Sequence, residues 1–316
     1  MAMTTQARTA VERFRPVGPG SRIGLVAPAS PFARESFDAG VSELSRLGFV
    51  PVFDDRVFAR EPIVAGSAAH RAAALQECFE RPDIDAVLTV RGGYGSAEVL
   101  PLLDPVRIRA SRKAFIGYSD VTSIHTFLTC HAGLASVHGP MIDGRLAIGS
   151  SGYDAASLLA ALSSQPVGPL EPEGLTVLRV GEAAGPLYGG TLSQLCASFG
   201  TPFTFDPPRG CVLLIDEVGE RPYRIRRMLT QLAQSGVLAR AAGVVIGQLP
   251  RCDEPGGEVT GVSVFAELLR EFPGPVVAGF PTGHSIAPLI TVPLGVDARL
   301  VGRGRAALVF DHAAAH

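Results

Sequence analysis

The sequence predicts an α/β protein whose N-terminal half contains a parallel, doubly wound sheet. Short apolar runs at 23–27, 49–53 and 85–90 have the character of buried strands, and apolar residues recur at helical spacing in the intervening segments 35–47 and 67–79. Strands that alternate with helices indicate a parallel sheet with helices on both faces. The composition, 47% apolar and 18% charged, is typical of a packed globular enzyme and excludes a disordered chain.

The second half of the chain is predicted to form another α/β unit. The stretch 185–192 is expected to be a turn that leads into a helix ending at Phe199. The expected strands and helices that follow are 211–215, a helix after Pro222, 242–246, 262–269, 276–278 and three short strands between 290 and 310.

These elements suggest four parts. Residues 1–19 are expected to be a flexible arm and residues 20–150 the domain that contains the doubly wound sheet. Between 151 and 174 Ser, Pro, Gly and Glu accumulate around one short helix, as expected for a linker. Residues 175–316 form the expected C-terminal domain.

Charge and cysteine content argue against several classes of partner and ligand. The net charge is −2 and basic residues cluster only around 221–227, so neither nucleic acid nor a membrane surface is expected as the main partner. Five scattered cysteines without metal-ligand spacing predict reduced thiols, no metal site and a cytoplasmic protein. Neither an N-terminal signal segment nor an apolar run of membrane-spanning length is visible.

The stretch 113–122 contains the first candidate catalytic residue, Ser119. It reads as a strand, a Gly117-Tyr118-Ser119 turn and a helix that begins near Val121. Such a turn exposes the serine hydroxyl at the carboxyl end of the strand, and the amide of Asp120 becomes a candidate oxyanion donor. The alternative is that Ser119 only caps the helix, because Val121 replaces the second glycine of the Gly-x-Ser-x-Gly pattern.

A glycine loop, Arg91-Gly92-Gly93-Tyr94-Gly95-Ser96, directly follows the strand 85–90. Its spacing matches neither a dinucleotide fingerprint nor a Gly-Lys-Ser/Thr phosphate loop. Ligands of parallel sheets bind outside the carboxyl ends of the strands, where the Ser119 turn is also expected. An amide of Gly92 or Gly93 is therefore a candidate second oxyanion donor, and a plain glycine turn is the alternative.

Two acids and one histidine also follow predicted strands. Asp216 and Glu217 end the strand 211–215, and their side chains should point to opposite faces, so only one can face a given site. Among seven histidines, His284 stands apart because it lies in a glycine-bounded loop directly after a strand. A serine, an acid and a histidine in this order are the residue types of a catalytic triad. His138, which follows a short strand, is a further residue that could approach the site.

Several short runs together resemble the LD-carboxypeptidase family of serine peptidases. They occur in the family's order and cover roughly residues 20–310. The runs are Ala27-Pro28-Ala29-Ser30, Arg91-Gly92-Gly93-Tyr94-Gly95, Ile116-Gly117-Tyr118-Ser119-Asp120, His138-Gly139-Pro140, Gly189-Gly190-Thr191-Leu192, Asp216-Glu217-Val218-Gly219-Glu220, Pro222-Tyr223-Arg224 and Gly283-His284.

The resemblance implies an enzyme that removes the terminal D-alanine from a muropeptide tetrapeptide. It implies a Rossmann-like N-terminal domain, a smaller C-terminal α/β domain, a site between them and commonly a homodimer. Ser119 matches the nucleophile and His284 the base, while the amides of Asp120 and of Gly92 or Gly93 match the oxyanion hole. The mechanism is acyl transfer and needs no cofactor. The candidates for substrate contact are Arg91, Tyr94 and Thr191.

The acid is where this sequence departs from the family, which usually has Leu-Glu-Asp at this strand end. Alignment through Val218-Gly219-Glu220 favours Asp216 as the triad acid, and a shifted strand would instead present Glu217. The family's Gly-Gly-Asn-Leu also becomes Gly-Gly-Thr-Leu here, which changes residue 191. Two other functions are considered: a self-immunity hydrolase that cleaves a peptidyl-nucleotide antibiotic, and a non-catalytic peptide or nucleotide binder in which His284 lies far from Ser119.

Overall fold

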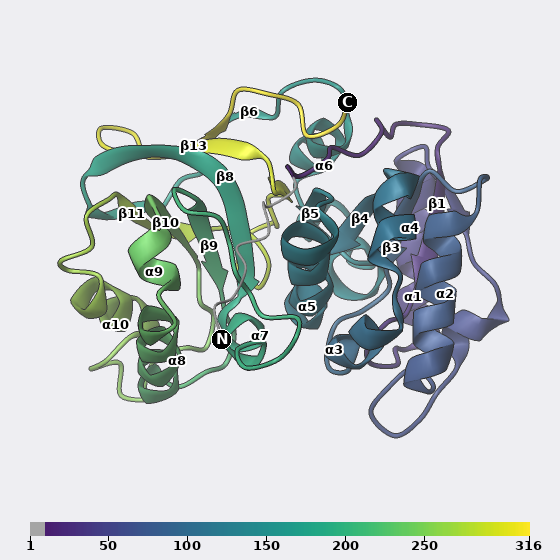
Figure 1. Ribbon diagram of the computed structural model, residues 1–316, viewed down its shortest axis with the longest axis horizontal. Coiled ribbons are helices and arrows are strands. Elements are labelled where there is room, and N and C mark those ends of the chain that lie inside the picture. Colours follow the sequence, from purple (N-terminus) through teal and green to yellow (C-terminus); the bar gives the residue numbers. More distant parts are fainter. Residues whose placement is uncertain (1–9) are drawn as a thin grey trace, which may run out of the picture.

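The computed structural model describes residues 10–316 and contains two sheets with their helices (Figure 1). Residues 1–9 of the expected arm lie outside the described residues. From Glu12 onward the expected flexible arm is not loose, because Glu12 and Phe14 form isolated bridges to Leu134 and Ala315. Phe14 and Val17 are apolar and buried, so their burial holds this segment against the body of the protein.

The first sheet has the order β12-β5-β4-β3-β1-β2, and all of its pairings are parallel except that of β12 with β5. Its strands are β1 (Arg22–Val26), β2 (Val50–Val52), β3 (Ala86–Thr89), β4 (Ala114–Gly117), β5 (Ser136–His138) and β12 (Val292–Leu294). The predicted parallel sheet is confirmed. The C-terminal half of the chain also contributes β12, which no sequence pattern placed in this sheet.

Helices cover both faces of the first sheet. One face packs against α2 (Ala68–Glu80), α4 (Pro105–Ser111) and α5 (Thr122–Thr126), and the other against α1 (Arg34–Arg46) and α6 (Ala155–Leu162). The short helices of this half are η1 (Asp55–Phe58), α3 (Ser96–Val99), η2 (Leu100–Leu102), η3 (Ser119–Val121), η4 (Phe127–Ala132), η5 (Ile142–Leu146) and η6 (Gly149–Ser151). The helix expected after Ser119 is therefore three consecutive helical segments rather than one regular α-helix.

The second sheet has the order β6-β14-β13-β8-β9-β10-β11-β7, with a parallel centre from β8 to β11 and antiparallel edges. Its strands are β6 (Gly168–Leu170), β7 (Thr176–Arg179), β8 (Gly181–Thr191), β9 (Val212–Asp216), β10 (Gly243–Gly247), β11 (Val276–Phe280), β13 (Asp297–Gly302) and β14 (Ala307–Phe310). Its helices are α7 (Leu192–Ala197), α8 (Pro222–Gln234), α9 (Val237–Arg240) and α10 (Gly261–Leu268). Within residues 151–174, α6 packs on the first sheet and β6 pairs with β14 of the second.

The turn predicted within 185–192 is wrong, because residues 185–191 are the second half of the long strand β8. The helix expected after it is present as α7, which begins at Leu192. The glycines of β8 allow neighbouring segments to lie very close to the strand backbone. A Cβ at Gly190 would lie 2.5 Å from the Thr122 hydroxyl oxygen of the first domain. The N–H of Thr191 donates to that same oxygen at 3.0 Å. The end of β8 is thus fixed against the start of α5, and this contact joins the two halves of the molecule beside the Ser119 turn.

Candidate active site

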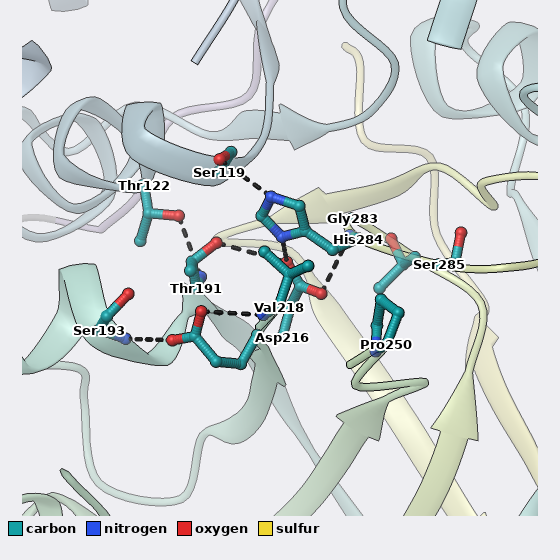
Figure 2. A network of polar contacts seen from close by, with 12 residues as sticks. Ser119, Thr122, Thr191, Ser193, Asp216, Val218, Pro250, Gly283, His284 and Ser285 are labelled. Carbon is teal, nitrogen blue, oxygen red and sulfur yellow. Dashed lines mark hydrogen bonds and ion pairs between the residues drawn. The ribbon is translucent and has the colours of Figure 1, made fainter. Parts of the chain in front are cut away.

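Ser119 lies on a strained turn directly after β4. Its φ of 71° is in the left-handed region, which a residue with a side chain adopts at a cost of about 1–3 kcal/mol. Tyr118, not Ser119, is the N-cap residue of the following helix, so the helix-cap interpretation of Ser119 is wrong. The Ser119 Oγ lies 3.0 Å from Nε2 of His284 (Figure 2). A strained serine between strand and helix, with its hydroxyl on a histidine, is the arrangement expected of a nucleophile.

Asp216 holds His284 by two hydrogen bonds, as Figure 2 shows. His284 Nδ1 lies 2.7 Å from Asp216 Oδ2, and the His284 backbone N–H donates to Oδ1 at 3.0 Å. Asp216 is fully buried at the end of β9. Burial by itself raises the pKa of Asp216, but the charge of His284 and the hydrogen bonds from its ring and backbone outweigh burial and lower that pKa. The acid is therefore ionised at neutral pH and orients the imidazole.

The shorter side chain of aspartate reaches the histidine because the loop comes unusually close to β9. Gly283 has a φ of 59°, and a Cβ built on it would lie 2.4 Å from Asp216 Oδ2. Any side chain at residue 283 would therefore collide with the carboxylate. A glycine directly before His284 is what lets the loop close the gap that an aspartate leaves.

Glu217 faces away from His284 and instead binds the first turn of α7. Its carboxylate accepts the backbone N–H of Ser193 at 2.8 Å and that of Val218 at 2.9 Å. Ser193 lies in the first turn of α7, so Glu217 satisfies a free N–H at a helix N-terminus. Burial raises the pKa of Glu217, and the two backbone hydrogen bonds act against this increase. The adjacent acids therefore point to opposite faces, as expected, and His284 contacts Asp216.

The glycine loop lies directly against Ser119, because β3 and β4 are neighbouring strands. A Cβ at Gly92 would lie 3.1 Å from Ser119 Oγ and 3.3 Å from the Asp120 amide nitrogen. Asp120 ties the loop to the serine turn: its carboxylate accepts the N–H of Ser96 at 2.8 Å, and its carbonyl accepts the Ser96 hydroxyl at 2.6 Å. Gly92 thus packs directly against the Ser119 side chain and the Asp120 amide. Gly93 is exposed in the same loop.

Arg71 supports this loop through hydrogen bonds to backbone carbonyls, and no prediction from the sequence included it. The guanidinium is buried and donates to the backbone carbonyls of Pro28, Gly66 and Gly95, while it pairs with Glu98. A signal for it does exist: Arg71 shares the inner face of α2 with Leu75 and Phe79, each four residues further on. A charged residue on an apolar helix face needs buried partners, and here these are loop carbonyls.

The three candidates for substrate contact lie in different environments. Arg91 is half-exposed and pairs with Asp143 at 3.1 Å. Tyr94 is 52% exposed at the outer end of the glycine loop. Thr191 is buried, and its hydroxyl donates to Asp216 Oδ2 at 3.3 Å, so its contact is with the acid (Figure 2).

His138 lies beside this cluster, and its bonded partner is Thr282. It is buried, its Nδ1 lies 3.1 Å from the Thr282 hydroxyl, and burial lowers its pKa to about 4. The neighbouring His125 is bonded to the Gly117 carbonyl and the Ser136 hydroxyl, and burial lowers its pKa to about 3. Both imidazoles are therefore neutral at pH 7.

Within residues 10–316, no His, Cys, Asp and Glu side chains gather into a group of three that could hold a metal ion.

Serine, histidine and buried carboxylate in hydrogen-bond sequence, set on an α/β fold, define a serine hydrolase. The comparison with known families makes this specific. The sequence pattern of the LD-carboxypeptidase N-terminal domain matches residues 23–139, and that of the LD-carboxypeptidase C-terminal domain matches residues 184–300. The chain belongs to the LD-carboxypeptidase family, so it is a serine peptidase, and the expected family membership is confirmed.

Curated relatives match over almost the whole chain. A putative carboxypeptidase of Streptomyces coelicolor is 38% identical, covering 92% of this chain and 94% of that protein. The murein tetrapeptide carboxypeptidase of Pseudomonas aeruginosa is 31% identical, covering 83% of this chain and 88% of that protein. The solved microcin C7 self immunity protein MccF in complex with aspartyl sulfamoyl adenosine has a TM-score of 0.88 at 23% identity, covering 95% of this chain and 98% of that chain. That structural likeness supports the fold. No helix in the described part of the chain is long and apolar enough to cross a membrane.

Proposed function

We propose that this peptidase hydrolyses an L,D-peptide bond and releases the terminal D-alanine of a muropeptide tetrapeptide, with Ser119, His284 and Asp216 as its triad. The observation that carries the triad is the continuous contact from Ser119 Oγ to His284 Nε2, at 3.0 Å, and from His284 Nδ1 to Asp216 Oδ2, at 2.7 Å. The family membership and the name of the Pseudomonas relative support the substrate.

The tautomer of His284 follows from the acid. An ionised carboxylate can only accept hydrogen bonds, so Nδ1 of His284 carries a proton and Nε2 presents a lone pair to Ser119. Nε2 takes the hydroxyl proton as Ser119 Oγ attacks the scissile carbonyl. The same imidazole then protonates the leaving amine of the D-amino acid. Water attacks the acyl-enzyme with His284 as base again, which restores the free serine.

The negative charge of the tetrahedral intermediate needs preorganised donors. The amides of Asp120 and of Gly92 or Gly93 are proposed for this role, and the packing of Gly92 against Ser119 supports it. Arg91 is proposed to bind the terminal carboxylate of the substrate, because a guanidinium fork suits bidentate pairing and its side chain is half-exposed. Tyr94, exposed on the same loop, is proposed to contact the peptide. Thr191 is proposed to support Asp216 rather than the substrate.

The test is release of D-alanine from a defined muropeptide tetrapeptide, measured by mass spectrometry. Wild-type protein should release it, while the same peptide ending in L-alanine should stay intact. The variant Ser119→Ala should keep the fold and lose activity on the order of a millionfold, since triad residues act as a unit. Normal turnover by a folded Ser119→Ala protein would contradict the serine mechanism.

A second candidate function is cleavage of a peptidyl-nucleotide antibiotic. It is favoured by one relative, the microcin C7 self-immunity protein of Escherichia coli, which is 26% identical and covers 89% of this chain. An aminoacyl sulfamoyl adenosine offered in the same assay separates the two functions: cleavage of this compound with the tetrapeptide left intact would favour self-immunity. We further propose a cytoplasmic homodimer, to be tested by fractionation and light scattering. The five cysteines, none of which forms a disulfide within residues 10–316, suit a reducing compartment.

A further inference from the structure

The side chain of Arg145 donates hydrogen bonds to the loop that contains His284. Its Nη2 donates to the carbonyl oxygens of Gly283 at 3.0 Å and Ser285 at 2.6 Å, and also contacts the Ser285 hydroxyl at 3.1 Å. Its Nη1 donates to the carbonyl of Gly152 at 3.3 Å. The two carbonyls bound by one guanidinium nitrogen belong to the residues immediately before and after His284. Their peptide planes are therefore fixed on both sides of the imidazole.

Arg145 reaches this loop from the half of the molecule that carries Ser119. It lies in η5, where the Asp143 N–H donates to the Val90 carbonyl at 2.8 Å, directly before the glycine loop. In the same segment, Ile142 packs so closely on α1 that a Cβ at Gly40 would lie 2.3 Å from its carbonyl oxygen. The segment that bears Arg145 is thus anchored to the first sheet and its helices.

Tyr118 lies next to Arg145, His284 and Ser119. Burial raises the pKa of the Tyr118 hydroxyl, and the nearby charge and hydrogen bond of Arg145 act against this increase. The Tyr118 ring meets the His284 ring edge-on, with centroids 5.1 Å apart. Tyr118 also directly precedes Ser119 in the chain. Arg145 therefore contacts the backbone around the base and the residue next to the nucleophile.

Further contacts to the loop come from its own domain, where Asp216 accepts the His284 backbone N–H. The Gln248 side-chain oxygen accepts the N–H groups of Ile286 and Ala287 at 2.7 and 3.1 Å. Gln248 follows β10 of the second sheet, so it does not relate the loop to Ser119. Contacts that cross between the halves at this loop include that of His138 with the Thr282 hydroxyl and those of Arg145 with the Gly283 and Ser285 carbonyls. Of these two residues, Arg145 is the one that binds the loop on both sides of His284.

We propose that Arg145 is a positioning residue that holds the His284 loop at its reacting distance from Ser119. This inference rests on the proposed Ser119–His284 chemistry and goes beyond it, because Arg145 touches neither reacting atom. Misplacement by about 1 Å of a catalytic group can cost roughly a hundredfold in rate. Removing the guanidinium should therefore reduce the reactivity of Ser119 without removing a substrate contact.

The experiment compares Arg145→Ala, Arg145→Met, Arg145→Lys and the control Arg303→Ala, whose guanidinium pairs with Glu182 on the surface. Two readouts are measured: kcat and KM for D-alanine release, and the rate at which a fluorophosphonate labels Ser119. Arg145→Ala should lower kcat and the labelling rate by about 10- to 100-fold with KM nearly unchanged. Arg145→Lys should recover part of the loss, because one ammonium can still donate to both carbonyls. Millimolar guanidinium should partly restore Arg145→Ala and leave Arg303→Ala unaffected.

Two results would overturn the proposal. One is wild-type labelling in a folded Arg145→Ala protein. The other is an unchanged kcat with KM raised about tenfold, which would make Arg145 a substrate-binding residue. Arg145→Met retains the apolar stem and decides the question if the alanine variant does not fold. A wild-type protein that is labelled but releases no D-alanine would refute the proposed substrate only, since the labelling rates would still test Arg145.

Discussion

Replacing Asp216 with asparagine tests which acid orients the histidine. Both carboxylate oxygens accept an N–H from the same residue: Oδ1 from the His284 backbone and Oδ2 from Nδ1 of the ring. An asparagine has one acceptor oxygen and one amide group that donates. If the oxygen stays on the backbone N–H, the amide faces Nδ1 and selects the tautomer that carries its proton on Nε2. That tautomer cannot accept the proton of Ser119.

The opposite rotamer of asparagine also cannot reproduce the contacts that aspartate makes. It would restore a hydrogen bond to Nδ1 but bring its amide group against the His284 backbone N–H, two donors facing each other in a fully buried position. The first arrangement therefore keeps both contacts with the wrong tautomer of His284, and the second loses the contact to the backbone N–H. We expect turnover to fall by about 10⁴, as when the orienting acid of a serine protease is neutralised, which is about 5.4 kcal/mol of transition-state stabilisation.

Glu217→Gln is the matched control, because it makes the same chemical change at the adjacent residue. Glu217 accepts two backbone N–H groups, and a glutamine oxygen can keep only one of them without rearrangement. The expected cost is about 1–3 kcal/mol of folding free energy, with kcat per folded molecule close to wild type. The assays are steady-state D-alanine release and thermal melting for both variants.

The reverse ranking would refute this reasoning. If Glu217→Gln lost about 10⁴ in kcat while Asp216→Asn retained most activity, Glu217 would be the orienting acid. A folded Asp216→Asn protein with wild-type kcat would show that His284 needs no orienting acid. The contact between Ser119 and His284 would survive either result.

Two further predictions concern the glycine loop and the buried histidines. Gly92→Ala should lower kcat by about 10²–10³, because its Cβ would lie 2.9 Å from that of Ser119 and displace an oxyanion donor; wild-type kcat would remove the loop from the mechanism. Acid should destabilise the fold, since His125 and His138 have an ordinary pKa of 6.5 that burial lowers to about 3 and about 4. The unfolded chain takes up these protons below about pH 6.5 and the folded chain does not, so the free energy of unfolding should fall by up to about 2.7 kcal/mol per pH unit towards pH 4. Urea unfolding at pH 7, 6 and 5 measures this, and a flat profile would contradict it.

Local patterns in the sequence were enough to predict most of the elements. The apolar run before Ser119, the glycine loop and the helix over 155–162 all follow from periodicity and turn residues that act over short distances. The order of serine, acid and histidine, each after a strand, also predicted one common site. Within one sheet this reasoning covers only the acid and the histidine, because β9 and β11 belong to the second sheet and their carboxyl ends lie along the same edge. Ser119 follows β4 of the first sheet, so its contact with His284 depends on how the two sheets pack together.

The strand β8 could not be predicted from its residues, because 185–192 contains three glycines and a proline and so has the composition of a turn. Those glycines are required by neighbours distant in sequence. A Cβ at Gly189 would lie 1.8 Å from the Leu214 carbonyl oxygen, and one at Gly190 would collide with Thr122. Glycine in a strand interior often marks such a close backbone approach, and only the packed structure shows what approaches.

The two acids also show what local sequence predicts and what depends on packing between distant segments. That Asp216 and Glu217 face opposite ways could be predicted from their adjacency in a strand, because side chains alternate along any strand. Which of them meets His284 depended on the face of β9 against which the loop after β11 packs, and Gly283 allows that close packing. The contacts of Arg71 and Arg145 likewise join segments far apart in the chain. Residue type and local spacing determine elements and candidate residues, whereas contacts between distant segments are decided by tertiary packing alone.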